Sequence, residues 1–169
     1  MPTPVGHALA GLALAGLASR RSALPASHIG ALVGCALAPD FDLVLRFVDG
    51  ANHHRGPTHS VGAAILAGLI GAVLTRFRFD APKAWLISAA WGSHVLLDYL
   101  GVDTSPPAGE MALWPFSNGF FVSPIQVFYD VPRSFTLAAT VHNLQAVAIE
   151  LIVLAPIAWF SWRGRAARG

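Results

Sequence analysis

The stretch Ala84–Leu100, AWLISAAWGSHVLLDYL, combines a long apolar run with two ionisable residues, His94 and Asp98. Its length meets the lower limit of about 17 apolar residues for a helix that crosses a membrane. Ionisable side chains at membrane depth are costly and usually functional. The stretch therefore predicts a membrane helix that carries part of a functional site.

Four further apolar segments surround this one: Val5–Ala18, His28–Phe47, Ser60–Thr75 and a fifth within Ser134–Trp162. The second and the last are long enough to span, the third is at the limit, and the first is short. We therefore expect one all-α domain over residues 1–169, built as an integral membrane bundle of about four or five short helices.

The composition supports a lipid environment. Apolar residues make up 54% of the chain and charged residues 12%, whereas soluble domains carry about a quarter charged residues. A lipid bilayer is therefore the expected partner. A net charge of only +2 gives no reason to expect nucleic acid. Cys35 is the one cysteine, so it cannot form an intrachain disulfide.

The longest connection, Gly101–Arg133, is rich in proline and aromatic residues such as Trp114 and Phe116. Its prolines exclude a long helix, and aromatic side chains favour the membrane interface. We expect an outer loop that lies at the interface and over a site.

The basic residues predict an orientation. If the N-terminus is outside and each segment crosses once, eight basic residues lie inside and three outside, which satisfies the positive-inside rule. This predicts a multi-pass inner-membrane protein with most of its histidines and carboxylates on the periplasmic side. The inner set is Arg20, Arg21, Arg76, Arg78, Lys83, Arg163, Arg165 and Arg168, and the outer set is Arg46, Arg55 and Arg133. Of the acids and histidines, His28 and Asp80 fall inside.

His94 and Asp98 are four residues apart, so they share one helix face. Such a pair forms half of a zinc site. The alternative is a hydrogen bond that only holds helices together.

Asp40 and Asp42 follow Pro39 near the end of an apolar segment. Proline disturbs the helix before it, so we expect a broken or terminating helix that aims one carboxylate inward. The alternative is a helix end exposed to water.

The densest polar cluster is His53–Ser60, HHRGPTHS. Its Gly-Pro pair predicts a turn that points His54 and His59 toward one centre and leaves Arg55 free to meet an anion. Thr58 or Ser60 is expected to cap the following helix. The alternative is a solvated loop.

His7 is a ligand or an interfacial polar residue. His142 and Glu150 lie about two helical turns apart, and Glu150 needs a partner inside the bilayer, in support of the site or as a structural hydrogen bond.

Together these motifs resemble the YdjM-like family of membrane-bound metal-dependent hydrolases. The resemblance extends to about Phe121 and implies an inner-membrane protein with hydrolase activity. The motifs are Thr3-Pro4-x-x-His7, Pro39-Asp40-x-Asp42, His54-Arg55-x-x-Thr58-His59-Ser60, His94-x-x-x-Asp98 and Leu113-Trp114-Pro115-Phe116.

The order Asp40 or Asp42, His59, His94, Asp98 is also similar to the zinc-dependent phospholipase C and nuclease fold, which implies phosphoester chemistry. The terminal HxxxE of that fold is missing, because Ala146 stands four residues after His142. A site for one or two metal ions is therefore favoured over three.

We expect metal-assisted hydrolysis of a small-molecule or lipid-linked substrate, with Zn²⁺ as the preferred divalent ion. Asp40 is the expected general base and Arg55 the substrate-binding residue. Two alternatives remain open: ion or proton movement without catalysis, and a metal-free lipid phosphatase with a phosphohistidine intermediate. The expected metal ligands are His7, Asp42, His54, His59, His94 and Asp98.

Overall fold

The computed structural model describes residues 1–77 and 81–163, and the regular structure in that part of the chain is helical. The expected all-α class is therefore confirmed, and five of the α-helices have 12 residues or more. Arg78, Asp80, Arg165 and Arg168, which entered the orientation argument, lie outside the described residues. The elements are α1 (Pro4–Ser19), α2 (Ala26–Leu37), the 3-10 helix η1 (Ala38–Phe41), α3 (Asp42–Asp49), α4 (Val61–Arg76), α5 (Ala84–Tyr99) and α6 (Leu137–Arg163).

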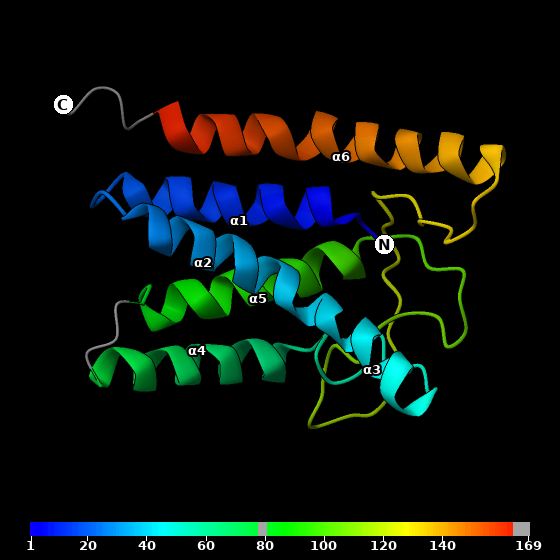
Figure 1. Cartoon of the computed structure of the whole chain (residues 1–169), viewed down its shortest axis with the longest axis horizontal. Coiled ribbons are helices and arrows are strands. Elements are labelled where there is room, and N and C mark those ends of the chain that lie inside the picture. The colour runs from blue at the N-terminus through cyan, green and yellow to red at the C-terminus, as the bar shows by residue number, and fades with distance from the viewer. Residues whose placement is uncertain (78–80, 164–169) are drawn as a thin grey trace.

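The long helices lie side by side, and α3, the loop before α4 and the long loop between α5 and α6 gather at one end, close to the N-terminus (Figure 1). Helix α1 packs against α2, α5 and α6, and α5 packs against α1, α2 and α4. Small residues permit this close packing. A Cβ at Gly11 would lie 2.9 Å from the Val33 Cα, and one at Gly68 would lie 2.8 Å from the Ser88 Cβ. Only glycine allows α1 to approach α2, and α4 to approach α5, this closely.

The first turns of α1 and α4 are capped by hydroxyl side chains. Thr3 caps α1, because its hydroxyl accepts a hydrogen bond from the Val5 amide at 3.2 Å. Ser60 caps α4 by accepting from the Ala63 amide at 3.0 Å, which confirms the expectation that Thr58 or Ser60 caps this helix. Each cap satisfies a backbone amide that the first turn of a helix leaves unpaired. Both helices therefore start at defined residues, and both starts lie at the loop end of the bundle.

The segment His28–Phe47 is not one helix. The chain leaves α2 at Leu37, passes through η1 and continues as α3. Pro39 explains the break, because proline has no amide hydrogen and its ring clashes with the preceding turn. The expected break at Pro39 is confirmed, whereas the expectation that this segment is long enough to span is wrong, since α2 has only 12 residues.

Within the described residues, α6 is the one helix both long and apolar enough to cross a membrane. Helix α5 has 16 residues, just under the expected limit, because the helix ends at Tyr99. Helices α1 and α4 are shorter apolar helices of 16 residues each. Among the described residues, one helix is therefore long enough to cross a membrane, whereas the apolar runs predicted three.

Candidate metal centre

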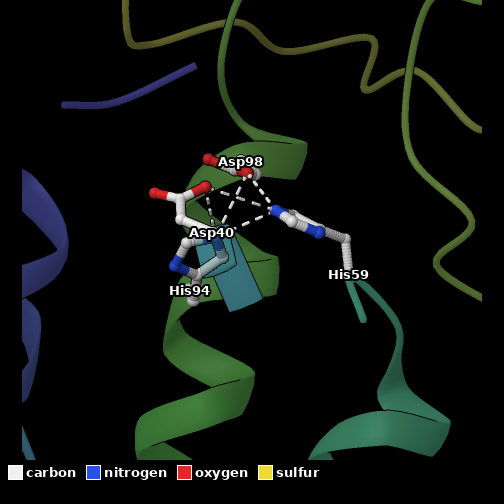
Figure 2. Close-up of side chains that lie close together, drawn as sticks. All are labelled: Asp40, His59, His94 and Asp98. Carbon is white, nitrogen blue, oxygen red and sulfur yellow. Dashed lines mark hydrogen bonds and ion pairs between the residues drawn. The ribbon is translucent and has the colours of Figure 1, made fainter. Parts of the chain in front are cut away.

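Four ionisable side chains from three parts of the chain converge at the loop end of the bundle (Figure 2). Asp40 comes from η1, His59 from the turn before α4, and His94 and Asp98 from α5. One ligand atom of each lies within 4.8 Å of the others. His59, His94 and Asp98 are buried, and the Asp40 side chain is 24% exposed. These four residues could therefore hold a divalent metal ion.

The two histidines are held so that their Nε2 atoms face the centre. His94 Nδ1 lies 2.8 Å from the Ala36 carbonyl, and because a carbonyl only accepts, Nδ1 carries the proton. His59 Nδ1 lies 3.1 Å from Asp42 Oδ2, which favours the same tautomer. Both Nε2 atoms then present lone pairs, 3.1 Å apart. Lone pairs this close repel unless a proton or a metal ion lies between them.

Asp98 completes this arrangement. Its side chain is 1% exposed, and Oδ2 lies 3.2 Å from His59 Nε2 and 3.4 Å from His94 Nε2. Neither carboxylate oxygen has a well-aligned hydrogen bond. A buried carboxylate normally needs such partners, so a bound cation fits this side chain well.

Asp40 lies on the more open side of the same centre. Its Oδ1 is 3.6 Å from His94 Nε2 and 3.7 Å from His59 Nε2. These distances are longer than those of Asp98, and the side chain is partly exposed. Asp40 can therefore act as a fourth ligand or receive a proton beside the centre.

Asp42 supports the centre from behind His59. Burial raises its pKa, but hydrogen bonds from His54, His59 and Thr58 outweigh burial and hold the pKa well below its usual range. Thr58 donates to Asp42 Oδ2 at 2.7 Å. Both acids after Pro39 thus point into the cluster, which corrects the expectation that only one would. The backbone changes direction between η1 and α3, so the spacing rule of one helix does not apply.

The cluster as a whole favours positive charge. Burial lowers the pKa of His59, but hydrogen bonds with Asp40, Asp42 and Asp98 raise it well above its usual value of 6.5. Three carboxylates around one imidazole thus create a site that stabilises a cation.

A second group, Asp42, His54 and His59, is also compact enough to hold an ion. It shares His59 with the first group, through the other ring nitrogen. His54 Nδ1 lies 2.9 Å from Asp42 Oδ1. The first group is the stronger candidate, because there both imidazoles have Nδ1 partners that leave Nε2 as the ligand.

His7 lies beside the first group and is not part of it. Its Nε2 is 3.3 Å from Asp98 Oδ1, and its ring stacks on His94 with centroids 3.7 Å apart. Its contacts suit a residue that orients Asp98 and His94.

Arg55 is not free to meet an anion, because its guanidinium pairs with Asp103 and donates to the Ser105 carbonyl at 3.2 Å. The residue is 3% exposed and has a left-handed backbone, with φ of 65°. The expectation of an unpaired Arg55 is therefore wrong, although the residue still lies at the edge of the centre.

Two residues of the loop Gly101–Arg133 that lie near the centre were not predicted from the sequence. Asp103 holds Arg55, and Glu110, 2% exposed, lines a small cavity together with Asp98. Burial, followed by the charge of Asp98, raises the pKa of Glu110 to about 9. Single acids in an irregular loop give no periodic signal, so only the fold reveals them. They support the expectation that this loop lies over the site.

The partners of Glu150 and His142 are now defined. The Glu150 carboxylate accepts from the Thr3 amide at 2.6 Å, the Thr3 hydroxyl at 2.6 Å and the Gly6 amide at 2.9 Å. It thereby ties α6 to the start of α1, one turn before His7. His142 pairs with Asp130 at 2.9 Å, away from the centre. Glu150 therefore supports the site by fixing α1, and His142 anchors the loop.

Comparisons with known proteins agree with the motifs. The inner membrane protein YbcI of Escherichia coli (strain K12) is 32% identical over 160 residues, which cover 90% of each chain. No solved structure gives a significant match. The model of the YdjM inner membrane protein family matches residues 1–168, well beyond the expected limit near Phe121. The chain therefore belongs to the YdjM inner membrane protein family.

Proposed function

We propose that this protein is a multi-pass membrane hydrolase that depends on a divalent metal ion, with Zn²⁺ preferred. One observation carries the proposal. The Nε2 atoms of His59 and His94 and the carboxylate of Asp98 face a single point, and both Nδ1 atoms are occupied elsewhere. Nitrogen and oxygen donors without thiolate suit zinc, and three protein ligands with one open position are typical of catalytic zinc.

The residues divide the work. His59, His94 and Asp98 hold the ion, Asp42 orients His59, and His7 orients Asp98. A divalent ion held by these residues would supply a water of lowered pKa, and thus hydroxide, near neutral pH. Asp40 lies at the open side, within reach of the centre, and is the general base. The substrate is a small or lipid-linked phosphoester.

The membrane arrangement is part of the proposal. Helices α4 and α6 expose many large apolar side chains, such as Leu69, 60% exposed, and Ile152, 73% exposed, which lipid would cover. Basic residues lie in or directly beside the last turns of α1, α4 and α6 and the first turn of α5. These helix ends lie opposite the loop end (Figure 1). With that basic end cytoplasmic, the candidate centre lies on the periplasmic side.

The test is hydrolysis of chromogenic phosphate esters and phosphatidic acid by protein purified in detergent. We expect zinc-dependent turnover that chelation abolishes. Asp40→Asn should retain zinc and lose most turnover, because the base is removed while three ligands remain.

Asp49→Asn is the matched control, because Asp49 also pairs with a histidine, His53, at 2.6 Å but is exposed. This variant should hydrolyse at the wild-type rate. Turnover that persists after complete metal removal would contradict the proposal.

A further inference from the structure

A cavity of about 410 Å³ lies beside the candidate centre. His54 and Arg55 of the HHRGPTHS turn form part of its wall. The cavity has the size of a small-molecule pocket. Its charged and polar lining includes Arg46, Asn52, Asp103, Thr104, Asp130 and Arg133.

The arginines outnumber the acids in this wall by three to two. Arg55 pairs with Asp103, and Asp130 is occupied by Thr104 and His142. Arg46 and Arg133 are exposed and have no acidic partner within residues 1–77 and 81–163. The lining of the cavity thus includes two guanidinium groups that no carboxylate compensates.

His54 links the cavity to the centre. Its side chain is 4% exposed, and its Nδ1 lies 4.0 Å from Asp40 Oδ1. Its Nε2 is buried and has no hydrogen-bond partner. A buried ring nitrogen without a partner in a cavity wall is a position where a ligand can complete the hydrogen bonding.

The distribution of basic residues points the same way. Arg46, Arg55 and Arg133 are the basic residues assigned to the periplasmic side, and all three line this cavity. Basic residues are otherwise concentrated on the cytoplasmic side of membrane proteins. Their grouping around one cavity is thus better explained by an anionic ligand than by topology.

We infer that this cavity is the anion subsite of the enzyme and takes a phosphoryl group, with Arg46 and Arg133 as its binding residues. The inference rests on the proposed hydrolase function and identifies where the phosphoryl group of the substrate binds. Guanidinium groups match phosphate oxygens in pairs of hydrogen bonds. The phosphoryl group belongs either to a soluble ester or to a lipid headgroup.

The test uses the full-length protein in detergent with chelator present, so that it does not depend on the metal. Inorganic phosphate is titrated by calorimetry. Dihexanoyl phosphatidic acid is compared with dihexanoyl phosphatidylcholine by thermal shift. Arg46→Gln and Arg133→Gln should each weaken binding by about tenfold or more, since each removes a charge-assisted contact. Arg133→Lys should recover part of it.

Arg76→Gln, an exposed arginine at the far end of α4, should leave binding unchanged. Arginine-dependent binding of inorganic phosphate supports a soluble source, and arginine-dependent binding of phosphatidic acid alone supports a headgroup. Binding of both probes that is absent, or that is insensitive to Arg46 and Arg133, overturns the inference. Metal content of the same variants, measured without chelator, tests the centre separately.

Discussion

Asp42→Asn tests whether the orientation of His59 controls metal binding. Asp42 accepts hydrogen bonds from three donors: Thr58 at 2.7 Å, His54 at 2.9 Å and His59 at 3.1 Å. An asparagine has one acceptor oxygen, and its NH₂ must face at least one of these donors. In either orientation of the amide, His59 loses the negative charge that holds its ring and raises its basicity, so Nε2 becomes a weaker ligand.

The expected magnitude follows from this geometry. The direct ligands stay in place, so zinc should still bind. Loss of the hydrogen-bond partner of a ligating histidine typically weakens metal affinity ten- to a hundredfold, or about 1.4–2.7 kcal/mol. Asp49→Asn removes an exposed histidine partner outside the centre and should leave affinity unchanged.

The assay is competition for zinc against a chromogenic chelator, with protein in detergent. Wild-type affinity in Asp42→Asn would refute the assigned role of Asp42. Complete loss of zinc would instead make Asp42 a ligand and favour the second group, Asp42, His54 and His59.

Three further predictions concern stability and topology. Glu150→Gln places an amide against donors that now bind a carboxylate, so it should destabilise the fold by about 2–3 kcal/mol and lower the melting temperature; an unchanged melting temperature would contradict the anchoring role. Glu110, with its pKa raised to about 9, is protonated when folded but ionised when unfolded above pH 4.5. The stability of the metal-free wild type should therefore fall as pH rises from 5 to 8. Glu110→Gln should remove up to about 1.4 kcal/mol of that loss per pH unit. The same dependence of melting temperature on pH in both proteins would contradict the raised pKa of Glu110. Reporter fusions at Gly109 should report the periplasm and fusions at the C-terminus the cytoplasm; a cytoplasmic signal at Gly109 would reverse the orientation.

The spacing of residues in the sequence predicted that His59, His94 and Asp98 lie in one site. His94 and Asp98 must share a face once Ala84–Leu100 is helical, and the Gly56-Pro57 turn brings His59 toward them. These three residues do lie together, with Asp40 beside them. The helical pair and the turn are local features, so residue spacing alone predicts them.

Other features depend on contacts between distant parts of the chain. The pairing of Arg55 with Asp103 and the burial of Glu110 arise only because the loop Gly101–Arg133 folds over the site. No spacing rule predicts such partners. The apolar run His28–Phe47 is likewise longer than the helix α2 that forms within it. Pro39 ends that helix, whereas hydropathy alone would continue it.

The centre itself is tested most directly by the metal content of wild-type protein purified in detergent after growth with zinc. Elemental analysis should find about one zinc ion per chain. His94→Ala and Asp98→Ala should lose it, since each removes one of three ligands, and Arg76→Gln should keep it. Wild-type protein that carries no metal under these replete conditions would contradict the proposed metal centre.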